Sequence, residues 1–264
     1  MLSFLRIKDI DKYGLDDPRR SLHHKDIIEG KPFLKRLYVE WYSRLKSQTT
    51  NLPEGPLIEL GSGGGFMKEI IPEVKTSDIM EFESNDYTFN ALDMPFEDNS
   101  ISAFLMVDVF HHVPDSEKFL QEMQRCLKAG GKIIMSEPCV SWWSKLIFKN
   151  FHHEPFRPEG DWSIPGTGPM SDANGALPWI VFQRDIERFN TSFPSLKLLE
   201  MQKHSALRYL LSGGVSMKQL VPNWSYSLIG GLEKAIRFVL PGFALFQFIT
   251  IINREKATLS GLKL

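Results

Sequence analysis

The stretch Leu57-Ile-Glu-Leu-Gly61-Ser-Gly63-Gly64-Gly65-Phe66 decides the fold of this chain. A short apolar run that ends in glycines is typical of a buried strand that turns directly into a helix. Glycines permit positive φ angles and close backbone approach, and the free N–H groups that open the next helix favour an anionic group. The stretch therefore predicts an α/β fold with a ligand-binding turn after one strand.

The same rhythm of strands and helices continues to residue 138. The apolar runs that predict further strands lie at 74–79, 88–91, 101–107 and 132–136. An amphipathic helix is expected over 116–128, and Gly130-Gly131 is expected to end it. Strands that alternate with helices indicate a parallel sheet.

The flanking regions differ in character from this central part. Residues 1–55 are charged and predict a helical extension, with a broad apolar face after Pro32. Residues 56–138 hold the regular strands and helices, and in residues 139–264 this rhythm loosens. The loop at 160–178 holds seven Gly or Pro in 19 positions, and loops of this length are usually functional or disordered.

Composition excludes several classes of protein. A chain of 264 residues makes one large domain or two small ones, and its net charge of −1 argues against a nucleic-acid partner. Its 42% hydrophobic content argues against disorder. We expect a cytoplasmic protein for three reasons. Two cysteines are too few for a disulfide framework, and the charged N-terminal segment has no signal-peptide core. The longest apolar run, of 15 residues, is too short to span a bilayer.

Several further motifs occur in a fixed order along the chain. Asp78 ends the second strand, where an acid can accept hydrogen bonds from both hydroxyls of a ribose. The later motifs are Asp93-Met-Pro-Phe-Glu-Asp-Asn-Ser-Ile, His111-His-Val and Leu127-Lys-Ala-Gly-Gly-Lys. With these motifs the chain resembles the class I S-adenosylmethionine-dependent methyltransferases, specifically the type-11 group, over roughly residues 30 to 138.

The resemblance implies a three-layer Rossmann-like methyltransferase fold, with a mostly parallel seven-stranded sheet, an antiparallel last strand and, here, an insert after strand five. It implies S-adenosylmethionine as the cofactor and S-adenosylhomocysteine as its product. Residues 56–138 are then the cofactor-binding half of the domain, and residues 139–264 are the acceptor-side insert, lid and C-terminal part of the same domain. The cofactor-binding residues that it implies are Glu59, Gly61, Ser62, Gly63, Gly65, Asp78, Ile79, Asn90, Ala91, Asp108 and Val109.

Two departures from the family pattern concern the adenine end of the site. Asn90 stands where the family usually has Asp, and its side-chain oxygen can still accept a hydrogen bond, with Asp93 as the alternative. Only eleven residues separate Asp78 from Asn90, so the helix expected between these strands is shortened or absent. Ile79 and Met80 are then expected to close this end.

Histidines are the candidates for acid–base chemistry. His152 and His153 follow strand five at the carboxyl edge of the sheet, where they could take a proton from the acceptor. The alternative is that His153 and Glu154 only hold the insert in place. His112 is expected to be structural, and because adjacent histidines of one strand point to opposite sides, no metal site is predicted.

The acceptor remains open at this stage: a small molecule, a sugar or a lipid-linked compound. Residues 139–180 are expected to form a lid over its pocket, because they combine Gly/Pro density with five aromatic residues: Trp142, Trp143, Phe148, Phe151 and Trp162. The apolar region 213–252 is explained by packing, with weak membrane contact as the alternative. Two other functions stay open. One is an NAD(P)-dependent oxidoreductase, which is disfavoured because Phe66 stands where the dinucleotide-binding pattern has a glycine, and the other is a non-catalytic cofactor-binding partner subunit. The oligomeric state is open as well.

Overall fold

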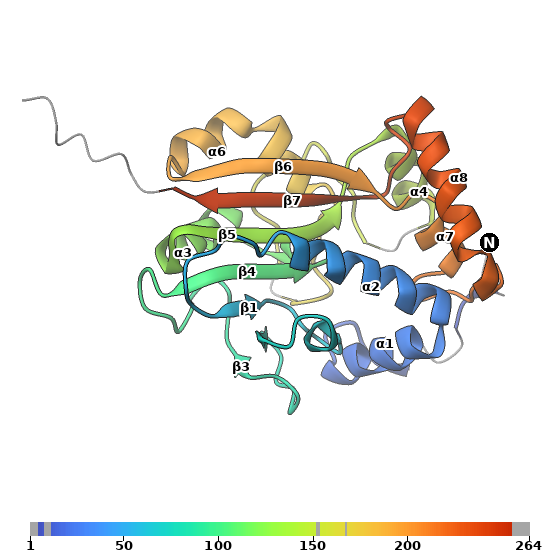
Figure 1. Ribbon diagram of the computed structural model, residues 1–264, viewed down its shortest axis with the longest axis horizontal. Coiled ribbons are helices and arrows are strands. Elements are labelled where there is room, and N and C mark those ends of the chain that lie inside the picture. Colours follow the sequence, from blue (N-terminus) through green and yellow to red (C-terminus); the bar gives the residue numbers. More distant parts are fainter. Residues whose placement is uncertain (1–4, 8–11, 152–153, 167, 255–264) are drawn as a thin grey trace, which may run out of the picture.

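The computed structural model describes residues 5–7, 12–151, 154–166 and 168–254 (Figure 1). Its strands are β1 (Leu57–Glu59), β2 (Val74–Asp78), β3 (Tyr87–Thr88), β4 (Ile101–Val107), β5 (Leu127–Pro138), β6 (Leu196–His204) and β7 (Phe246–Asn253). Its α-helices are α1 (Pro18–Gly30), α2 (Pro32–Ser47), α3 (Ser116–Cys126), α4 (Trp142–Phe151), α5 (Leu177–Trp179), α6 (Ile186–Ser192), α7 (Arg208–Ser212) and α8 (Tyr226–Val239). Shorter turns of helix are η3 (Met67–Glu69), η4 (Phe110–His112), η5 (Ile180–Arg184) and η6 (Asn223–Ser225).

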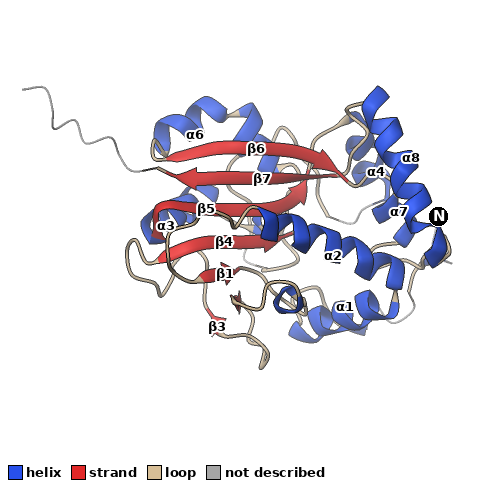
Figure 2. Cartoon of the chain, viewed as in Figure 1, coloured by secondary structure: helices blue, strands red, loops and turns tan. Residues whose placement is uncertain are grey.

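The strands form one seven-stranded sheet in the order β3-β2-β1-β4-β5-β7-β6. The pairs from β3 to β5 are parallel, whereas β7 runs antiparallel to both β5 and β6. The predicted fold class is confirmed, with helices on both sides of the sheet (Figure 2). Strand order reverses between β1 and β4, and such a switch point opens a crevice at the carboxyl ends of the strands.

Alternate residues of the central strands pack on opposite faces of the sheet, as the period of two in a strand requires. In β4, Phe104 and Met106 join the core that α3, α5 and α6 cover, whereas Ala103 and Leu105 join the core beneath α1 and α2. The predicted apolar face of α2 is buried in this second core. The helical N-terminal extension is thereby part of the layer that covers the sheet.

The prediction for the end of α3 is wrong. The helix ends at Cys126 and β5 begins at Leu127, so Gly130 and Gly131 lie within the strand. The pairing of β4 with β5 shifts there, because Ile101 faces Leu127 while Ala103 faces Lys132. A Cβ on Gly131 would lie 2.9 Å from the carbonyl oxygens of both Lys128 and Ser102, so the glycine serves this irregularity rather than a helix end.

The segment between β2 and β3 has no helix, as the short spacing predicts. Residues 79–86 form bends and turns instead, and β3 is reduced to two residues at the edge of the sheet. The crevice is therefore bordered here by a loop.

Candidate functional site

The glycine turn after β1 is shaped by close contact with the chain that follows β4. Gly61 has a φ of +62°, and a Cβ at this position would lie 2.5 Å from Cγ2 of Val109. Only glycine satisfies both the left-handed backbone and this approach. The backbone N–H of Ser62 donates to the carbonyl of Ser77 (2.9 Å), which fixes the turn against β2.

Asp78, at the end of β2, holds the other side of this turn. Its carboxylate accepts hydrogen bonds from the backbone N–H groups of Gly63 (2.8 Å) and Met80 (2.9 Å). Burial raises the pKa of Asp78, although these backbone donors lower it. Each carboxylate oxygen keeps a second lone pair, so the group can also accept from the two hydroxyls of a ribose.

Glu59, the last residue of β1, is buried and incompletely bonded. Its Oε2 atom has no hydrogen-bond partner among the described residues, and burial raises the pKa of Glu59 to about 7. A buried carboxylate oxygen without a partner costs about 1–3 kcal/mol, and more when it is charged. This atom therefore fits a ligand that brings a donor, such as an ammonium group.

One cavity of about 550 Å³ joins these groups. It is lined by all eleven residues that the sequence predicts for the cofactor: Glu59, Gly61, Ser62, Gly63, Gly65, Asp78, Ile79, Asn90, Ala91, Asp108 and Val109. At its outer end, Oδ1 of Asn90 accepts from the N–H of Leu92 (2.9 Å), and Ile79 is half exposed. The residues present thus fit a nucleoside cofactor with an amino-acid tail, although their role as its ligands stays a prediction.

The segment after β4 departs from the sequence prediction. His111 and His112 lie on the 3-10 helix η4, not on a strand, so their rings do not point to opposite sides. Their ring centroids are 4.3 Å apart. The premise that these two histidines lie on one strand and point to opposite sides is therefore wrong, because β4 ends at Val107.

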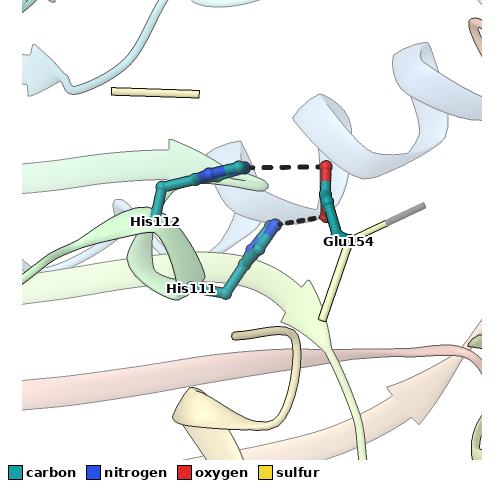
Figure 3. Close-up of side chains that lie close together, drawn as sticks. All are labelled: His111, His112 and Glu154. Atoms are coloured by element: carbon teal, nitrogen blue, oxygen red, sulfur yellow. Dashed lines mark ion pairs between the residues drawn. The ribbon is translucent and has the colours of Figure 1, made fainter. Parts of the chain in front are cut away.

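Glu154, which belongs to the insert after β5, lies close to both histidine rings. Glu154 places Oε2 3.4 Å from Nε2 of His111 and Oε1 3.9 Å from Nε2 of His112 (Figure 3). The predicted catalytic residues His152 and His153 lie outside the described residues. From the sequence alone, Glu154 is expected only to hold the insert in place, although the run His152-His-Glu-Pro predicts a position at the carboxyl edge of the sheet.

Charges within this cluster shift one another's protonation. Burial lowers the pKa of His111, but the carboxylates of Glu137 and Glu154 raise it well above the ordinary value. Burial and the neighbouring His111 lower the pKa of His112 to about 4. Burial raises the pKa of Asp108 to about 8. Strongly shifted groups that meet in a cleft are typical of functional sites.

Aromatic and aliphatic residues of the predicted lid form the remaining wall. Ile147, Phe148 and Phe151 of α4 and Phe156 of the following loop line the cavity. No tryptophan lies among the described lining residues: Trp162 is in the core and Trp142 is exposed. Of the five aromatic residues that the sequence names for the lid, Phe148 and Phe151 line the cavity, whereas Trp142, Trp143 and Trp162 do not.

The chain is similar to known methyltransferases. Residues 58–135 match the family described as "Methyltransferase domain". Demethylmenaquinone methyltransferases of Listeria welshimeri and Listeria monocytogenes are 30% identical over 104 residues, which cover 38% of this chain and 43% of theirs. The chain thus matches less than half the length of these curated relatives.

A solved structure resembles the whole fold. It is geranyl diphosphate C-methyltransferase from Streptomyces coelicolor A3(2), in complex with Mg²⁺, geranyl diphosphate and S-adenosyl-L-homocysteine. Its TM-score is 0.53 at 16% identity, over 94% of this chain and 90% of that one. The family match at residues 58–135 confirms the resemblance to the class I type-11 methyltransferases for this part of the chain.

Proposed function

We propose that this protein transfers a methyl group from S-adenosylmethionine to a small, largely apolar acceptor. The observation that carries the proposal is the single cavity, in which the glycine turn, Glu59 and Asp78 lie together with the histidine cluster and the apolar wall of α4. When bound, S-adenosylmethionine supplies a methyl group on an electrophilic sulfonium. The protein then has to position the two reactants and exclude water.

Each part of the chain has a definable task in this reaction. The turn at Gly61 gives backbone access, Glu59 would accept from the ammonium group, and Asp78 would accept from the ribose. Asp108, which is predicted to contact the cofactor, and the histidine pair follow the end of β4, where the acceptor would approach. With its pKa near 8, Asp108 is placed to hold or accept a proton there.

Two observations favour a lipid-linked acceptor over a sugar. The cavity wall from the insert is mostly apolar, with Ile147, Phe148 and Phe151 on α4. The curated relatives are named for a quinone, demethylmenaquinone, and the solved relative for geranyl diphosphate. An acceptor with an apolar chain is consistent with both.

The outward face of α8 supports the same acceptor class. Leu228, Leu232 and Phe238 point into solvent, and Phe238 is 89% exposed. Packing inside the protein, the explanation that the sequence favours for this region, holds for Tyr226 and Glu233, which are buried. It does not explain why the apolar residues of this face are exposed. On α4 and α8 the exposed charged residues are basic: Lys145, Lys149 and Lys234. An apolar face bordered by lysines is typical of a helix that lies on an anionic lipid surface.

The start of α4 lies close to the segment that follows α8. Trp142, at the start of α4, lies against Gly242 just after α8, and its ring centroid is 6.0 Å from that of Phe243. Because α4 also lines the cavity, a lipid-linked acceptor could pass from this surface along α4. No described helix is both long and apolar enough to cross a bilayer. We also propose a cytoplasmic location, since both cysteines are free and buried.

A labelled-methyl screen tests the proposed reaction. Purified protein and methyl-labelled S-adenosylmethionine are incubated with prenylated quinones or phenols, glycans and amines, and the products are extracted into organic solvent. We expect label in the organic phase with prenylated acceptors. Label only in the glycan or amine arm would contradict the acceptor class, and binding of S-adenosylmethionine without label in any arm would favour a non-catalytic partner subunit.

A further inference from the structure

We propose that His111, His112 and Glu154 form a site for a divalent transition-metal ion on the acceptor side of the cavity. One ring nitrogen of each histidine and a carboxylate oxygen of Glu154 all lie within 4.8 Å of one another (Figure 3). All three residues line the cavity, so an ion bound to them would keep open positions toward a ligand. Two imidazoles and one carboxylate with open positions form a donor set that suits zinc, iron or cobalt.

The tautomers of both rings are set by their outer contacts. Nδ1 of His112 lies 3.0 Å from the carbonyl oxygen of Asp172, which can only accept, so Nδ1 carries the hydrogen. Nδ1 of His111 lies 2.7 Å from the carboxylate of Glu137 and donates to it in the same way. Metal-binding histidines almost always donate their other N–H to a carboxylate or carbonyl. Both Nε2 atoms are thus the ones left to bind a metal.

The two separations from Glu154 to the histidine rings are close to those of atoms that share one ion. At metal–ligand distances of about 2.1 Å, neighbouring donor atoms lie roughly 3.0–3.4 Å apart. Oε2 of Glu154 is 3.4 Å from Nε2 of His111, and Oε1 is 3.9 Å from Nε2 of His112. A small rotation of the Glu154 side chain closes the second gap. The ion would replace any proton on Nε2 of His111, and that proton would pass to solvent.

The site would bind oxygen atoms of the acceptor, such as hydroxyl, carboxylate or phosphate oxygens. This use of the ion rests on the proposed function, whereas metal binding itself does not. The rival interpretation is that the three side chains form only a hydrogen-bonded cluster, in which a proton on His111 joins Glu137 and Glu154.

Cobalt(II) distinguishes these interpretations in the full-length protein without S-adenosylmethionine. Protein treated with a chelator and then dialysed is titrated with Co²⁺, and visible absorption between roughly 500 and 650 nm is recorded. We expect one equivalent to bind with ligand-field bands. We expect Glu154→Gln and His112→Ala to weaken binding about 100-fold or more, since even loss of an outer hydrogen bond costs 10–100-fold.

Glu159→Gln is the matched control, because Glu159 is exposed in the same insert and lies outside the cavity lining. It should bind Co²⁺ as the wild type does. Thermal melting of each variant shows whether it is folded. Folded wild-type protein that gives no bands and no saturable binding, or a folded Glu154→Gln variant that binds as tightly as the wild type, would overturn the proposal. A parallel titration with S-adenosylmethionine reports separately on the proposed function.

Discussion

Nδ1 of His111 lies 2.7 Å from Oε2 of Glu137, the residue before the last of β5. The other oxygen of Glu137 accepts from the backbone N–H groups of Val109 (2.9 Å) and Phe110 (2.8 Å). One fully buried carboxylate thus fixes both the turn after β4 and the orientation of a histidine ring. The glycine turn after β1 packs against Val109 of the same segment, so Glu137 supports both sides of the cavity.

Replacement of Glu137 should therefore affect the whole protein. Glutamine has the same shape but only one acceptor oxygen, so Glu137→Gln leaves a backbone N–H group or the His111 ring without an acceptor. We expect a loss of about 3 kcal/mol in the free energy of unfolding, as for other broken buried pairs. Urea denaturation measures it. The exposed Glu159→Gln variant should stay within about 0.5 kcal/mol of the wild type, and an equally small change for Glu137→Gln would refute the supporting role.

Gly61→Ala should abolish cofactor binding. The new Cβ would lie 2.5 Å from Val109 Cγ2 and would sit on a left-handed backbone, so either the turn or the β4 segment must move. We expect binding of S-adenosylmethionine to fall below detection in calorimetry. Gly231→Ala is the control, since its Cβ would have no atom within 4 Å and it lies on the exposed side of α8. Retained binding by Gly61→Ala would show that the turn is not part of the site.

The fold was predictable because its signals are local. The glycine turn, Asp78 and the strand at 132–136 each follow from a few adjacent residues, and the structure places them as expected. The end of α3 was not predictable, because Gly130 and Gly131 are needed for a strand irregularity that depends on the pairing of β4 with β5. Local propensity cannot report that pairing.

The part of the site that depends on local sequence was predictable as well. The eleven proposed cofactor residues line one cavity because each lies at the end of a strand, or shortly after it, at one edge of the sheet. The cluster of His111, His112 and Glu154 was missed, since it depends on a 3-10 turn after β4 and on how the distant insert returns to it. Neither the turn nor the return has a sequence signature of its own.

Glu59 should give the stability of the ligand-free protein a distinctive pH dependence. Its pKa is about 7 in the folded protein against an ordinary value of 4.5, so the folded state keeps the proton longer than the unfolded state. Stability contributed by this group is present at low pH and is lost as pH rises through about 7. Between pH 4 and pH 8, the free energy of unfolding of the wild type should fall by about 3 kcal/mol relative to that of Glu59→Gln. Urea denaturation at each pH measures both proteins. If their free energies of unfolding change with pH in the same way, the raised pKa of Glu59 is contradicted.

The exposed face of α8 should bind anionic vesicles. Leu228→Ser combined with Phe238→Ser removes apolar groups from a surface that packs against nothing described, so the fold should survive. In a flotation assay with vesicles that contain phosphatidylglycerol, we expect the wild type to rise with the vesicles. The double variant should stay at the bottom of the gradient. Thr191→Ser, on the exposed side of distant α6, serves as the control. Absence of wild-type flotation would remove the membrane contact and leave the methyl transfer untouched.

Calorimetric titration of the purified chain with S-adenosylmethionine and, separately, with NAD tests the central claim most directly. The structure predicts one equivalent of S-adenosylmethionine, no saturable binding of NAD, and at least a tenfold weaker affinity, about 1.4 kcal/mol, when Asp78 is replaced by alanine. Saturable binding of NAD without any binding of S-adenosylmethionine would contradict it.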